Sequence, residues 1–127
     1  MSAMSNSKIK KMSPQLLVAD LNNAIVFYTE KLGFELEFLY DDFYAGIHKD
    51  VCSIHLKCGK PSAAERKSKG ENNDLDIIFS VDHVEDLYGE FLERSIEIVQ
   101  PLCDMPYGKE FYIADPDGNV LAYLQEV

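Results

Sequence analysis

The chain has 127 residues, 46% of them hydrophobic and 27% charged, and its 22 Asp and Glu outnumber its 12 Lys and Arg to give a formal net charge of -10. This length suits one compact domain, and seven Phe, seven Tyr and many aliphatic residues supply a hydrophobic core, which argues against a disordered chain. An acidic surface repels phosphate groups, so the charge argues against nucleic acids and anionic membranes as partners and leaves a neutral or cationic small molecule.

The chain opens with a Ser-rich, Lys-bearing segment, residues 1–12, which lacks an apolar core; we expect a flexible tail and not a signal peptide. No stretch of the sequence has the length of uninterrupted apolar residues that a membrane span requires. The three cysteines form no CxxC pair, which indicates neither a disulfide framework nor a zinc knuckle and favours a reducing, cytoplasmic compartment.

The first predicted strand covers residues 16–19, ends in an acidic turn and leads into an amphipathic helix. Asp20 is the expected N-cap of this helix, and Gly33 is the expected residue at its end. The apolar positions follow the i, i+3, i+4, i+7 rule and are Leu21, Ala24, Ile25, Tyr28 and Leu32.

Three strands are expected between residues 34 and 58, with two-residue turns at 41–42 and 49–50. The pairs that these turns place opposite each other are Tyr40 with Phe43, His48 with Val51, and Tyr44 with His55. One face of this sheet is then apolar and must pack on the helices, since a slip of one residue would mix the two faces. The other, polar face carries Glu35, Glu37, Leu39, Tyr44, Gly46, His48, Ser53, His55 and Lys57.

The second half of the sequence repeats this plan. A strand at 77–81 precedes a helix that Asp82 or His83 would cap, and further strands are expected at 96–101, 109–114 and 119–125, with a type I turn at 115–118. The apolar face of the second helix carries Val84, Leu87, Tyr88, Phe91 and Leu92. The sequence therefore predicts an α+β fold in a single domain, with one βαβββ module at 13–58, a polar linker at 59–74 and a second module at 75–127.

Paired motifs at the two ends of the chain carry a family resemblance. Residues 18–21 (VADL), 27–28 (FY) and 32–34 (LGF), together with 106–108 (PYG), Phe111 and 115–119 (DPDGN), resemble the vicinal oxygen chelate superfamily of glyoxalases, bleomycin resistance proteins and extradiol dioxygenases. The resemblance implies that the two modules form a curved mixed-sheet cup with helices on the outside. It also implies a homodimer, with the modules pairing either within one chain or across two chains.

The resemblance places the four metal-ligand positions of the family on Ser13, His55, Asp76 and Ala122. Only His55 and Asp76 can ligate a metal, whereas a catalytic metal normally has three protein ligands. We therefore expect a metal-free protein without a cofactor, similar to bleomycin resistance proteins, that sequesters a small molecule without chemistry. The alternative is a divalent-metal-dependent enzyme, a glyoxalase-type lyase, isomerase or transferase, with the metal held by His55, Asp76 and waters.

If the polar face of the first module lines the cup, it supplies acidic and hydrogen-bonding groups. Continuing the strand pairing into the second module, with Ala114 opposite Asn119, turns an apolar wall inward. The candidate ligand-binding residues are Glu37, Leu39, Tyr44, His55, Asp76, Ile78, Tyr107, Phe111 and Ile113. Such a site suits an amphipathic ligand with a flat or apolar part that stacks on the apolar wall and a cationic or polyhydroxyl part. The competing interpretation is that the carboxylates are ordinary solvated groups that serve solubility.

Overall fold

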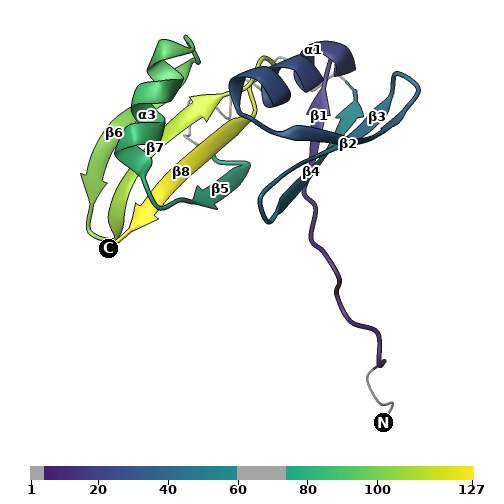
Figure 1. Cartoon of the computed structure of the whole chain (residues 1–127), viewed down its shortest axis with the longest axis horizontal. Helices are drawn as coiled ribbons and strands as arrows, with labels where there is room; N and C mark the ends of the chain where they lie inside the picture. The colour runs from purple at the N-terminus through teal and green to yellow at the C-terminus, as the bar shows by residue number, and fades with distance from the viewer. Residues whose placement is uncertain (1–4, 60–73) are drawn as a thin grey trace.

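The computed structural model describes residues 5–59 and 74–127, which fold into two modules of the same design (Figure 1). The first module consists of β1 (Gln15–Val18), α1 (Leu21–Val26), the π-helical turn η1 (Phe27–Lys31), β2 (Glu35–Tyr40), β3 (Tyr44–Lys49) and β4 (Cys52–Cys58). The second consists of β5 (Ile77–Ser80), α3 (Val84–Glu93), β6 (Ile98–Met105), β7 (Gly108–Ala114) and β8 (Val120–Glu126). The predicted linker lies, except for its two end residues, outside the described residues, as do residues 1–4.

Each module contributes one four-stranded mixed sheet. The strand orders are β1-β4-β3-β2 and β5-β8-β7-β6. In both sheets the first strand pairs in parallel with the last, and the remaining pairs are antiparallel. This topology confirms the predicted α+β fold of two βαβββ modules.

The helices begin as the sequence predicts, but only one of them has the expected cap. Asp20 caps α1, since its carboxylate accepts a hydrogen bond of 3.0 Å from the backbone N–H of Asn23. His83 occupies the N-cap position of α3 without a side-chain capping bond. The side chain of Gln125 in β8 accepts the N–H of Val84 instead, at 3.0 Å. The start of α3 is therefore satisfied by a tertiary contact.

The pairing predicted for the first sheet is wrong, and the turns explain why. The β2–β3 turn contains three residues, with Asp41 at a positive φ of 47°, so Tyr40 pairs with Tyr44. The β3–β4 turn lies at 50–51, one residue later than expected, so Lys49 pairs with Cys52. This second shift moves the β3–β4 pairing by an even number of residues and preserves both faces. Accordingly, the core-facing residues of the two strands are fully buried, as predicted: Ala45, Ile47, Ile54 and Leu56.

A β-bulge in β2 separates two registers of that strand. Leu36 still pairs with Ile47, but Phe38 pairs with Gly46 and Leu39 with Ala45. The three-residue turn has shifted this end of the strand by one residue, which exchanges its faces. Phe38 therefore lies on the outer, polar face, and Leu39 lies on the opposite one.

The pairing predicted for the second sheet is also wrong by one residue. Ala114 pairs with Val120 because Asn119 belongs to the preceding turn, where its backbone carbonyl accepts the N–H of Asp115 at 2.9 Å. Phe111 then pairs with Tyr123, and Ile113 pairs with Leu121. Both Phe111 and Ile113 are fully buried against the core, so the inward-facing wall predicted for them does not exist.

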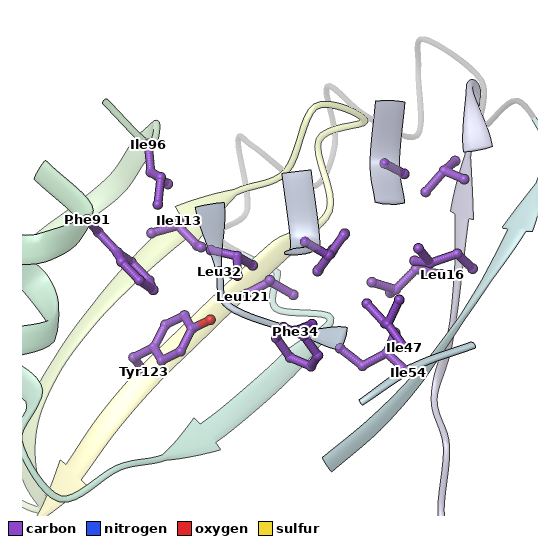
Figure 2. Close-up of a cluster of buried hydrophobic side chains, with 14 of the residues drawn as sticks. Leu16, Leu32, Phe34, Ile47, Ile54, Phe91, Ile96, Ile113, Leu121 and Tyr123 are labelled. Carbon is purple, nitrogen blue, oxygen red and sulfur yellow. The ribbon is translucent and has the colours of Figure 1, made fainter. Parts of the chain in front are cut away.

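The core-facing sides of the two sheets share one hydrophobic core. Figure 2 shows Leu121 and Tyr123 on one side and Leu16, Ile47 and Ile54 on the other, with one continuous cluster between them. Because each sheet turns one face to this shared core, the opposite faces of the two sheets point outward.

The turn at 115–118 connects the two modules. It closes with a hydrogen bond of 3.0 Å from the N–H of Gly118 to the carbonyl of Asp115, as expected for a β-turn. The buried Asp115 accepts the hydroxyl of Tyr28 in the first module at 2.8 Å, and Asp117 accepts the N–H of Ala19 at 2.8 Å. The turn therefore holds the two modules together through side-chain hydrogen bonds.

Candidate ligand-binding site

Three aromatic side chains gather on the outward face of the first sheet. Phe38 stacks on Tyr44 with ring centroids 6.1 Å apart, and both rings form T-shaped contacts with His55, with centroids 5.2 Å and 5.5 Å from it. We call Phe38, Tyr44 and His55 the aromatic cluster. The sequence predicted Tyr44 and His55 for this face but missed Phe38, because the bulge and the longer turn cannot be recognised from the alternation of residues.

A hydrogen-bond chain orients the polar groups of the aromatic cluster. The amide Nε2 of Gln15 donates to the hydroxyl of Tyr44 at 3.1 Å, and this hydroxyl lies 2.9 Å from Nδ1 of His55. Since the hydroxyl accepts from Gln15, its own proton is free to donate to Nδ1. These two hydrogen bonds fix the orientation of the Tyr44 hydroxyl and of the His55 ring on the outward face.

Gly46 makes the position of Phe38 possible. A Cβ at residue 46 would lie 2.1 Å from the ring of Phe38, so any side chain there would displace that ring. A glycine inside a strand often marks such a close approach, and this is the signal in the sequence that could have indicated Phe38.

A small pocket whose wall includes polar side chains lies next to the aromatic cluster. It has a volume of about 340 Å³ and is lined in part by Lys11, Glu37, His48 and Ser53. The hydroxyl of Ser53 is buried and has no hydrogen-bond partner within 5–59 and 74–127. Lys11 donates to Glu37 at 3.1 Å, and this hydrogen bond is the main reason why the pKa of Glu37 is lowered. Aromatic stacking surface and the buried Ser53 hydroxyl therefore lie on the same outward face of the first sheet.

The structure separates Leu39 from this site. Leu39 pairs with Ala45 on the core-facing side of β2 and is 45% exposed at the sheet edge. The β-bulge in β2 therefore takes Leu39 off the candidate face and places Phe38 on it.

The predicted residues of the second module lie on their own outward face or beside it. Ile78 pairs with Ala122 and is 59% exposed. The carboxylate of Asp76 accepts the N–H of Val120 at 2.8 Å, which ties it to the start of β8. Tyr107 lies in the β6–β7 turn and donates to the buried Glu110, and chiefly this hydrogen bond raises the pKa of Tyr107 to about 12.

Within one chain these two faces do not form a common cup. The first sheet brings Glu37, Tyr44 and His55 together, whereas Asp76, Ile78 and Tyr107 belong to the second sheet, whose free face points away from the shared core on the other side. Phe111 and Ile113 lie inside that core and are not part of either face.

The donor groups do not fit the metal centre that some members of the resembled family use. In the described part of the chain, no three His, Cys, Asp or Glu side chains converge. His55 engages Tyr44 through Nδ1 and lies beside Gln15 of β1, and Asp76 engages Val120. With alanine at position 122 and serine at position 13, two candidate ligands remain where three are normally required.

No described helix has the length and apolar character needed to cross a lipid bilayer. The three cysteines, Cys52, Cys58 and Cys103, are free.

Comparisons with known proteins agree with this architecture. The chain superposes on the bleomycin-binding protein of bleomycin-producing Streptomyces verticillus, solved with copper(II)-bleomycin, with a TM-score of 0.70 and 21% identity over 95% of this chain and 99% of that one. For TnmS3, an antibiotic binding protein from Streptomyces sp. CB03234, the TM-score is 0.74 and the identity 21%, over 98% of this chain and 100% of that one. For the fosfomycin resistance protein FosX of Listeria monocytogenes, the values are 0.68 and 15%, over 100% and 95%.

These structural similarities establish the fold alone, and no curated protein matches the sequence. A family model matches residues 12–123, which is most of the chain. The protein therefore belongs to the glyoxalase/bleomycin resistance protein/dioxygenase superfamily.

Proposed function

We propose that this protein is a metal-free binding protein that sequesters an amphipathic, cationic small molecule on the aromatic cluster. The observation that carries the proposal is the cluster of Phe38, Tyr44 and His55 beside the pocket lined by Ser53, whose buried hydroxyl has no hydrogen-bond partner among the described residues. Aromatic faces bind the planar part of a ligand, and an acidic protein of net charge -10 favours a positive one. The bleomycin-binding and antibiotic-binding proteins of the same fold support this class of ligand.

We propose that the protein binds its ligand without a metal, because its candidate donor side chains do not form a centre with three ligands. The alternative, a divalent-metal-dependent lyase, isomerase or transferase, has only His55 and Asp76 to draw on, and both are engaged in hydrogen bonds. The free cysteines and the acidic surface fit a cytoplasmic protein.

Titration with bleomycin and other planar cationic drugs tests the ligand class. We expect saturable binding by calorimetry, and Phe38→Ala should weaken it about tenfold because it removes the stacking partner of Tyr44. Phe43→Ala is the matched control, since Phe43 lies 52% exposed in the β2–β3 turn outside the aromatic cluster. Flat titrations across such drugs, or equal losses in both variants, would contradict the proposal.

The proposal includes a homodimer in which two chains complete each cup. The outward face of the first module carries the aromatic cluster, and the outward face of the second carries the exposed Ile78. A second copy that sets its second module against the first module of its partner encloses both faces and buries this apolar surface. Sedimentation equilibrium should therefore show a dimer, and a monomer at all concentrations would refute it.

Mixing two defective variants tests whether each cup is shared between chains. Phe38→Ala damages the first module, and Ile78→Arg damages the second. A heterodimer of the two variants contains one cup with both defects and one intact cup, so random exchange should restore about a quarter of the wild-type sites. Cups formed within single chains would give no restoration on mixing.

A further inference from the structure

A second cavity lies between the modules, on the core side and not on the outward faces. Its volume is about 410 Å³, which is within the range of small-molecule sites. Both modules and α3 contribute to its wall, and its mouth is bordered by the β3–β4 turn. The apolar side chains that line it include Leu32, Phe34, Phe79 and Phe91. This cavity is therefore separate from the aromatic cluster, which occupies the opposite face of the first sheet.

Tyr123 brings a hydroxyl to the aromatic part of this cavity. Tyr123 lines the cavity and is only 6% exposed, and its ring packs on Phe79 with centroids 5.0 Å apart. Figure 2 shows the hydroxyl of Tyr123 on the side of its ring that is turned toward Phe34. Burial raises the pKa of this phenol, so it stays protonated and can donate. A hydroxyl in an apolar enclosure gains from any ligand that supplies an acceptor.

The rim of the cavity is acidic. Its lining includes four carboxylates, one ammonium group and one histidine: Asp50, Asp82, Asp86, Glu90, Lys49 and His83. Glu90 is also ion-paired with Arg94 at 3.8 Å, and Asp82 lies 3.8 Å from His83. The carboxylates come from the β3–β4 turn and from the first two turns of α3 and the segment before it. They lie at the mouth, where a bound cation would keep part of its hydration while it gains charge interactions.

We propose that this inter-module cavity is a second binding site that takes a small arylalkyl amine. The aromatic ring of such a ligand packs among Phe34, Phe79 and Phe91, and an oxygen on the ring accepts the proton of the Tyr123 hydroxyl. The ammonium group, two or three bonds from the ring, reaches the carboxylates of the rim. Because the ligand lies between residues of both modules, it also bridges them and stabilises their packing.

Three probes that share a 4-hydroxyphenyl ring and differ in charge test the site on the full-length protein: tyramine, its neutral analogue tyrosol, and 3-(4-hydroxyphenyl)propionate, its anionic analogue. We expect tyramine to bind saturably in an NMR titration and to shift resonances of Phe34, Phe91 and Tyr123. Tyrosol should bind about tenfold more weakly, and the anion should not bind measurably. Equal binding of the three probes, or shifts confined to the aromatic cluster, would overturn the proposal.

Conservative variants assign the roles of the individual groups. Tyr123→Phe keeps the ring and should weaken both tyramine and tyrosol about tenfold, whereas the double variant Asp86→Asn with Glu90→Gln should weaken tyramine only. Glu93→Gln is the matched control, because Glu93 lies on the same helix but does not line the cavity. Resonance shifts read at Phe34, Phe91 and Tyr123 separate this site from the proposed drug site, whose residues lie on the opposite face of the first sheet. Unchanged affinity in Tyr123→Phe, with thermal unfolding as in the wild type, would refute the role of the hydroxyl.

Discussion

Replacing Phe111 with alanine should lower the free energy of unfolding by about 3–5 kcal/mol. Phe111 is fully buried, stacks on Tyr123 with centroids 5.3 Å apart, and meets the edge of Phe91 at 5.7 Å. Removal of this ring leaves a cavity in the part of the core that the second sheet and α3 share, and the surrounding aromatic rings cannot close it fully. Urea denaturation followed by circular dichroism measures the change.

The same variant distinguishes a core residue from a ligand contact. If Phe111 lined a cup, as the alternation of residues predicted, alanine would reduce drug affinity and leave stability nearly unchanged. We expect the opposite result. Phe43→Ala provides the reference, since an exposed turn residue should change stability by no more than about 0.5 kcal/mol. Comparable stability of the two variants would disprove the strand pairing of β7 with β8.

Replacing Asp115 with alanine should lower the free energy of unfolding by about 3–4 kcal/mol, because several buried hydrogen-bond donors lose their acceptor. The carboxylate accepts the hydroxyl of Tyr28 at 2.8 Å, the side-chain amide of Asn119 at 2.9 Å, and the backbone N–H groups of Asp117 and Asn119, both at 2.9 Å. These donors hold the 115–118 turn together and join it to the first module. Differential scanning calorimetry should show a lowered melting temperature.

A double-mutant cycle isolates the bond between the modules. Tyr28→Phe removes one donor and should cost about 1 kcal/mol in the wild type, but little in the Asp115→Ala background, where its acceptor is already missing. Additive losses would show that the Tyr28 hydroxyl contributes to stability by another route than Asp115.

The pH dependence of stability in the acid range also reports on the carboxyl group of Asp115. Burial raises the pKa of Asp115 above its ordinary 3.8, although the hydrogen bonds to the carboxylate act in the other direction. The unfolded chain therefore loses this proton at lower pH than the folded chain, so the contribution of Asp115 to stability is full below 3.8 and declines as the pH rises through the raised pKa. Asp115→Asn does not titrate, so its stability relative to wild type should improve as the pH rises above 3.8.

Local signals in the sequence were sufficient to predict the helices, the strands and the repeated βαβββ module. The helix from Leu21 to Leu32 is predicted by its apolar spacing, and its start by Asp20, because both depend on neighbours within one or two turns. The fully buried inner faces of β3 and β4 followed from alternation, which survives a pairing shift of two residues.

The sequence failed where a single extra residue decides which way a side chain points. The third residue of the β2–β3 turn and the bulge after Leu36 exchange Leu39 for Phe38 on the candidate face. In the second sheet, Asn119 is held in the turn by Asp115, and this moves Phe111 and Ile113 into the core. The alternation of residues gives no information on turn length. Which residues of a strand face the core therefore cannot be decided until the length of its turn is known.

The acidic composition, the α+β class and the two βαβββ modules were determined by the sequence alone, because charge, periodicity and turn motifs are local properties of the chain. Tertiary structure alone decided how the modules meet. Both sheets turn their apolar faces to one shared core, since burial is greatest when two apolar faces cover each other. This packing turns the aromatic cluster outward, encloses Tyr123 beside the inter-module cavity, and thereby separates two sites that no pattern in the sequence distinguishes.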